Sequence, residues 1–117
     1  MYTEAISETQ KAVSLSGGYA LYKASLGHIY GMAGRREDAR KILEELQERA
    51  KREYVSPFAL ALIHTGMGDK DRAFASMEQA YKARDTILVN YLKDPQLETL
   101  RTDARLNDLI ARVGLQP

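Results

Sequence analysis

The chain of 117 residues contains no cysteine, which excludes disulfides and thiolate metal sites. It also has almost no net charge, because 17 Lys and Arg balance 16 Asp and Glu. Nucleic-acid interfaces and polybasic membrane patches both need clustered positive charge, so this balance argues against them. No apolar run approaches the ~20 residues of a transmembrane helix, and no signal-peptide pattern opens the sequence. We therefore expect a soluble, cytoplasmic, single-domain protein.

Small and apolar residues recur along the chain at an interval of thirty-four residues. Such a period is typical of helical repeats, in which each unit is a pair of helices. The pairs of positions at this interval include Gly34 and Gly68, Ala39 and Ala73, Gly27 and Ala61, Tyr30 and His64, and Leu43 and Met77.

Apolar residues at helical spacing predict helices near residues 3–15, 19–33, 36–52, 56–67, 70–83, 87–93 and 103–114. Ser56-Pro57, Asp69, Asp94-Pro95 and Asp103 have the composition of helix starts. The helix expected at 36–52 is charged on one face, with acids four residues before bases, so we interpret that face as solvated.

Five residues at 26–39 match a known pattern: Leu26, Gly27, Tyr30, Gly34 and Ala39. They make the chain resemble the tetratricopeptide repeat, a helix-turn-helix unit of thirty-four residues. The resemblance implies an all-α, right-handed solenoid with a helical C-terminal cap. In its frame, residues 1–117 are one domain: 2–18 is the second helix of a truncated repeat, 19–53 and 54–87 are repeats, and 88–117 forms divergent capping helices.

The ending Asp-Pro-Gln-Leu-Glu-Thr-Leu-Arg-Thr-Asp-Ala-Arg-Leu-Asn-Asp-Leu resembles the closing segment of repeat domains in bacterial regulators. These include winged-helix transcription factors, nucleotide cyclases and protein kinases. None of their effector domains is present in this sequence.

The residues offer no constellation for catalysis, a cofactor or a metal. His28 and His64 are the only histidines, and neither has a further ligand three or four residues away. We interpret His64 as a replacement for a packing tyrosine and His28 as lining the concave face. Gly17-Gly18 follows a helix and lacks the lysine of a nucleotide-binding loop. We expect no enzyme activity.

The resemblance implies a protein or peptide partner, bound as an extended peptide or a helix in the concave groove. Relatives that clamp the carboxylate of chaperone tails use lysine, asparagine and arginine at set groove positions. Here those positions carry Ala24, His28, Ala59 and Val89, and only Lys93 matches in charge, which argues against that ligand. The groove residues, as we name this predicted set, are Leu21, Ala24, Ser25, His28, Val55, Phe58, Ala59, Leu62, Val89, Leu92 and Lys93. Simple packing between helices is the alternative interpretation of this apolar set.

A second hypothesis is self-association as a homodimer. A missing first helix would leave the apolar side formed by Ile6, Ala12 and Val13 uncovered, and uncovered apolar patches tend to mark association surfaces. The competing interpretation is that the chain is a fragment of a longer repeat array, in which upstream sequence would cover this side.

Overall fold

The computed structural model describes residues 2–114, and every regular element in this range is a helix. The predicted all-α fold is confirmed. The elements are α1 (Tyr2–Leu15), α2 (Ala20–Met32), α3 (Arg36–Arg49), α4 (Pro57–Gly66), α5 (Lys70–Lys82), α6 (Thr86–Tyr91), the 3₁₀ helix η1 (Pro95–Leu100) and α7 (Ala104–Gly114).

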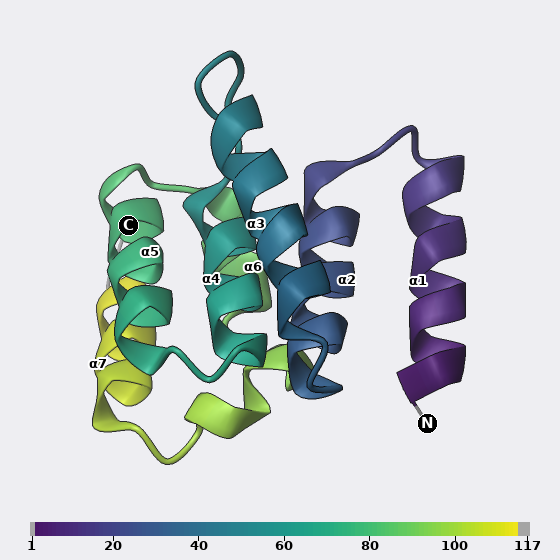
Figure 1. Cartoon of the computed structure of the whole chain (residues 1–117). Coiled ribbons are helices and arrows are strands. Elements are labelled where there is room, and N and C mark those ends of the chain that lie inside the picture. The colour runs from purple at the N-terminus through teal and green to yellow at the C-terminus, as the bar shows by residue number, and fades with distance from the viewer. Residues whose placement is uncertain (1, 115–117) are drawn as a thin grey trace.

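The helices follow the interval of the sequence pattern. α1, α3, α5 and α7 begin at residues 2, 36, 70 and 104, each thirty-four residues after the one before. Neighbouring helices stand side by side, with α1 at one edge of the molecule and α5 and α7 at the other (Figure 1). The fold is thus a tetratricopeptide-like helical repeat. Its right-handed superhelix and the division into units at residues 18, 53 and 87 stay predictions.

Local cap chemistry fixes where the helices begin. Ser56 accepts a hydrogen bond from the backbone N–H of Phe58 at 3.1 Å, and Pro57 occupies the first helical position, where no N–H is needed. Asp69 caps α5 and Asp94 caps η1 in the same way. These predicted starts are confirmed. After Asp94 the chain forms a 3₁₀ turn. The first helix of the last helix pair is therefore broken into α6 and η1.

The centre of the molecule is α4, which is buried on nearly every side. Its neighbours are α2, α3, α5 and η1. A helix that is apolar all round belongs inside an array, and the sequence of α4 has this character. Its buried residues are Phe58, Ala59, Ala61, Leu62, Ile63, His64, Thr65 and Gly66.

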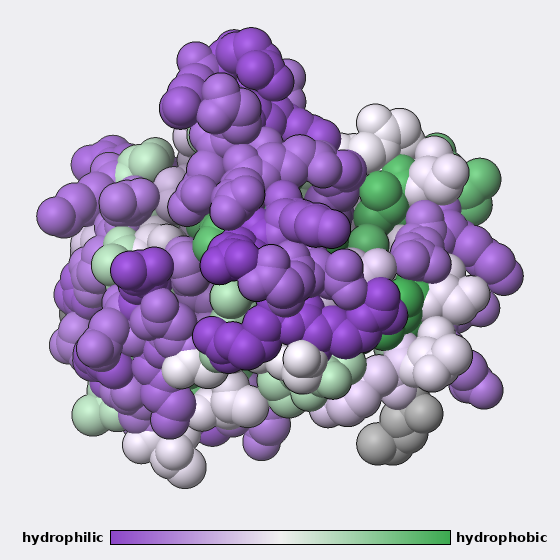
Figure 2. Space-filling view, in the orientation of Figure 1, coloured by the Kyte–Doolittle hydropathy of each residue, from purple (hydrophilic) through white to green (hydrophobic). Residues whose placement is uncertain are grey.

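In contrast to the apolar α4, α3 carries charged residues along its exposed side. Glu45 and Arg49 form the expected pair four residues apart, with 3.5 Å between their oxygen and nitrogen atoms. The face that α3 and α5 present in Figure 2 is mostly hydrophilic. This matches the interpretation of a solvated outer face.

The N-terminal helix differs from expectation. Ile6 is buried, and Ala12 and Val13 are half-buried, because α2 packs against this side of α1. Gln10 adds a polar link, since its Nε2 donates to the hydroxyl of Tyr30 at 3.1 Å. The side expected to lie uncovered is therefore covered within the chain. Self-association through α1 stays a prediction.

Candidate partner-binding surface

Most of the groove residues lie inside the core. Ala24, Phe58 and Leu62 have no exposed surface, because α2 packs directly on α4 and the segment of α6 and η1 folds back over α4. The rings of Phe58 and Tyr91 lie 6.2 Å apart, centroid to centroid, where this segment returns. Leu21, His28, Val55, Ala59 and Leu92 are also buried, Ser25 is half-buried, and Val89 and Lys93 are exposed.

The two histidines are buried in the core. His28 Nδ1 lies 3.0 Å from the carbonyl oxygen of Leu62, which joins α2 to α4. Burial lowers the pKa of His28, and it also lowers the pKa of His64 on α4. Both imidazoles are therefore biased toward the neutral form. His28 stabilises the contact between the two helices rather than facing an open groove.

Two surface pockets are each lined in part by groove residues. The smaller has a volume of about 170 Å³ and lies at the N-terminal ends of α2, α4 and α6; we call it the tyrosine pocket. Its lining consists of Tyr19, Ala20, Leu21, Tyr54, Val55, Ser56, Ala59 and Ile87. The larger, about 390 Å³, lies between α6 and α7 and is lined by Val89, Asn90, Leu92, Lys93, Ile110, Val113 and Gly114.

Two exposed tyrosines form the rim of the tyrosine pocket. Tyr19 is 46% exposed and Tyr54 is 70% exposed. Tyr22, 43% exposed, packs edge to face against Tyr19, with 5.1 Å between ring centroids. The sequence analysis did not select these tyrosines. The sequence does carry a signal for them, because Tyr19 lies just before α2 and Tyr54 lies just before α4, the first helices of their helix pairs.

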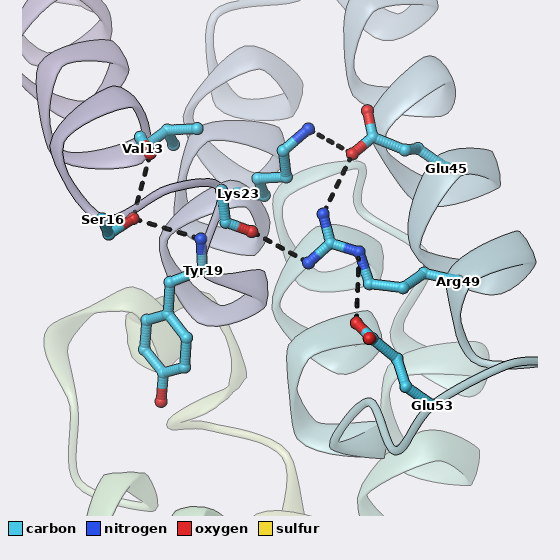
Figure 3. Close-up of polar contacts among 8 residues, drawn as sticks. Val13, Ser16, Tyr19, Lys23, Glu45, Arg49 and Glu53 are labelled. Carbon is cyan, nitrogen blue, oxygen red and sulfur yellow. Dashed lines mark hydrogen bonds and ion pairs between the residues drawn. The ribbon is translucent and has the colours of Figure 1, made fainter.

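A hydrogen-bonded turn positions Tyr19. The hydroxyl of Ser16 donates to the carbonyl oxygen of Val13 at 3.0 Å and accepts from the backbone N–H of Tyr19 at 3.1 Å. The backbone φ of Gly17 and Gly18 is 71° and 86°, a region that glycine enters readily. The Tyr19 ring points away from the charged side chains that surround the turn (Figure 3).

Arg49 on α3 connects this turn to the rest of the array. Its Nη1 donates to the carbonyl oxygen of Gly18 at 2.8 Å. Glu45 and Glu53, one turn before and after it, pair with the same guanidinium at 3.5 and 3.6 Å. Glu45 also pairs with Lys23 of α2 (Figure 3). The network holds the α1–α2 turn, and with it one side of the pocket, against α3.

Tyr54 is positioned by Asp85, thirty-one residues later in the chain. Its hydroxyl donates to Oδ2 of Asp85, while Oδ1 of Asp85 accepts from the backbone N–H of Ile87 at 2.8 Å and caps α6. Partial desolvation and this carboxylate raise the pKa of Tyr54 to about 12. The phenol therefore stays protonated and donates throughout the neutral range. The pocket is closed on this side by a fixed aromatic ring.

The site offers apolar surface and aromatic rims, and we find no grouping suited to a metal ion. Among residues 2–114, no three His, Asp or Glu side chains lie together as metal ligands would. No helix within the same range is long and apolar enough to cross a membrane. The two tyrosines combine a large apolar area with a polar tip, a character that is common at protein interfaces.

The fold and this surface define the chain as a helical repeat protein. Residues 58–86, which cover α4 from its second residue, α5 and the first residue of α6, match the family model of the tetratricopeptide repeat. This part of the chain is therefore similar to a tetratricopeptide repeat, a motif of protein–protein interaction that is typical of non-catalytic scaffolds. No curated protein matches the chain, and no solved structure does.

Proposed function

We propose that the chain binds a short apolar segment of a partner protein in the tyrosine pocket. The observation that carries this proposal is an apolar pocket rimmed by Tyr19 and Tyr54, which are 46% and 70% exposed. Tyrosine is enriched among the residues that dominate binding energy at interfaces. The predicted groove contributes three residues to this pocket, namely Leu21, Val55 and Ala59.

The volume of the pocket indicates the size of what enters it. Pockets for drug-sized ligands and cofactors usually measure about 300–1,000 Å³. At about 170 Å³, the tyrosine pocket suits a single anchoring side chain of a larger partner. This favours an extended peptide or a helix with one apolar anchor, rather than a free small molecule.

The test is selection of random peptides displayed on phage against the wild-type chain, followed by calorimetry with the peptides that are enriched. Tyr19→Ala and Tyr54→Ala should each weaken binding about fivefold or more, as loss of a central interface tyrosine does. Tyr2→Ala is the matched control, because Tyr2 is 40% exposed but lies at the far end of α1. Equal binding by all four proteins would refute the proposal.

Self-association is the second candidate, and the exposure of Leu15 is the observation that favours it. Leu15 ends α1 beside the α1–α2 turn and is 90% exposed. Light scattering of the wild type and Leu15→Glu across a range of concentrations distinguishes the two candidates. A mass that doubles for the wild type and not for Leu15→Glu would favour the homodimer. A monomer at every concentration would remove it.

A further inference from the structure

Two arginines lie in the chain segments that meet beside the tyrosine pocket, and neither forms an ion pair in the described part of the chain. Arg52 lies two residues before Tyr54, in the α3–α4 connection, and Arg84 directly precedes Asp85. Both side chains belong to exposed residues. The Tyr54–Asp85 hydrogen bond brings their two chain segments together at one side of the pocket. Both arginines therefore belong to segments that meet at Tyr54.

The acids at this end of the molecule already have partners. Glu53 pairs with Arg49 at 3.6 Å, and Glu45 pairs with both Arg49 and Lys23. Asp85 is buried, accepts the hydroxyl of Tyr54 and caps α6. Asp85 has only uncharged partners, so its one buried carboxylate stands against two exposed arginines, and the segments that meet at Tyr54 keep an excess of positive charge.

The backbone of Arg84 adds an independent observation. Its φ is 54°, whereas the other residues in the described chain with positive φ are the glycines Gly17, Gly18, Gly34 and Gly68. A side chain at such a position is disfavoured, and non-glycine residues held there cluster at functional sites. At the turn between α5 and α6 the chain thus carries an exposed arginine where glycine fits better.

We propose that the partner segment carries a carboxylate next to its apolar anchor, so that it pairs with Arg52 and Arg84 while the anchor enters the tyrosine pocket. This inference rests on the proposed function and names the chemistry of the partner. Complementary charge across an interface selects the partner and speeds its association. A second copy of the chain fits this face poorly, because a two-fold contact here would bring the two arginines of one copy toward those of the other.

The test uses the peptides selected by phage display on the wild-type chain. We expect the enriched sequences to carry Asp or Glu within a few residues of a large apolar residue. Each peptide is then compared with its Asp→Asn or Glu→Gln form by calorimetry at low and high salt. The carboxylate form should bind several-fold more tightly, and the difference should shrink at high salt because salt screens exposed charges.

Variants of the chain locate the effect. Arg52→Gln and Arg84→Gly should each weaken binding of the acidic peptide about threefold, the range of a single exposed ion pair. They should leave the amide form of the peptide unaffected. Lys41→Gln is the control, since it removes one exposed positive charge from α3, away from the pocket.

Two results would overturn the inference. In the first, the selected peptides carry no acid near the anchor, or the arginine variants bind the acidic and amide peptides alike. If Tyr19→Ala and Tyr54→Ala still abolish binding in that case, the proposed function stands and only the carboxylate is refuted. In the second, neither the tyrosine nor the arginine variants change binding, and both proposals fail together.

Discussion

Gly66 of α4 lies against the backbone of His28 of α2. A Cβ atom at Gly66 would stand 2.3 Å from the carbonyl oxygen of His28, well inside contact distance. Gly31 faces Gly66 in the same crossing, where an added Cβ would meet the Gly66 carbonyl carbon at 2.6 Å. The two helices therefore pack backbone to backbone, and the His28–Leu62 contact lies one turn away. Close packing here holds α2 and α4, the first helices of successive helix pairs, rigidly together.

The crossing predicts opposite outcomes for two helical glycines. Gly66→Ala should lower the free energy of unfolding by about 3 kcal/mol, because the rigid backbone of α2 cannot yield to the new methyl group. Gly27→Ala should stay within about 1 kcal/mol of the wild type. Its Cβ would meet side chains rather than backbone, Ile63 at 3.0 Å and Ile42 at 3.4 Å, and alanine favours the helix. Urea denaturation followed by circular dichroism measures both, and equal midpoints would contradict the backbone contact.

The buried histidines predict a loss of stability in mild acid. Burial lowers the pKa of His28 and His64 in the folded state, so the unfolded chain binds protons first as the pH falls. Their contribution is complete above the unfolded pKa of about 6.5 and is lost as the pH falls through the folded values. The urea midpoint should therefore drop as the pH falls below the unfolded value of about 6.5.

Substitution separates this effect from that of the carboxylates. His28→Asn offers an amide to the Leu62 carbonyl and cannot take up a proton in mild acid. It should therefore reduce the drop in the urea midpoint. Arg112 lowers the pKa of Glu78, and that contribution is lost only below the ordinary glutamate value of about 4.3. A drop of unchanged size in His28→Asn and in His64→Asn would show that the histidines do not cause it.

The helix starts could be read from the sequence because cap chemistry is local. Ser56, Asp69 and Asp94 each bond to an amide two or three residues ahead, so composition alone locates them. The helical repeat was equally accessible from its period. The sequence could not show which groove positions are open and which are filled. Their burial depends on where the segment of α6 and η1 returns over Phe58.

The tyrosine pocket escaped prediction for a related reason. Tyr54 is held by Asp85, thirty-one residues later, and no local pattern records that contact. The same holds for Arg49, whose bond to the carbonyl of Gly18 spans thirty-one residues in the other direction. Contacts between residues so far apart in the sequence become visible only when the helices are packed together.

Arg49 predicts a local effect on the first helix. Arg49→Met removes the bond to the Gly18 carbonyl and both ion pairs, so the α1–α2 turn should open more often. Amide hydrogen exchange in α1 should accelerate about fivefold, the equivalent of one hydrogen bond to a charged group that is partly exposed. Lys51→Met is the matched control, because its pairing with Glu48 stays within one turn of the chain.

Two arginines of α7 attach the last helix to α5. Arg105 stacks 4.4 Å from the centroid of Phe74 and pairs with Asp71, while Arg112 stacks 4.9 Å from Tyr81 and pairs with Glu78. Arg112→Lys keeps the charge but loses the planar group that bonds and stacks together. We expect it to lower stability by about 1 kcal/mol, nearly as much as Arg112→Ala. Full retention of stability in Arg112→Lys would show that charge alone suffices.

Arg84 gives the prediction that separates folding from binding. Its φ of 54° strains a residue with a Cβ, and its N–H and that of Asp85 bond to the carbonyl oxygens of Tyr81 and Ala80 in the turn that ends α5. Arg84→Gly should therefore raise the free energy of unfolding by about 1 kcal/mol, since glycine adopts this conformation freely. Arg84→Ala, which keeps the strain and removes the charge, should leave stability nearly unchanged.

If Arg84 serves only the turn, the glycine variant is more stable and binds the acidic peptide as the wild type does. If its guanidinium faces a partner, both variants lose affinity to the same extent, although only the glycine variant gains stability. Binding of the partner would then explain why position 84 carries arginine although glycine would make the fold more stable. Thermal denaturation and calorimetry on the same three proteins decide between the two.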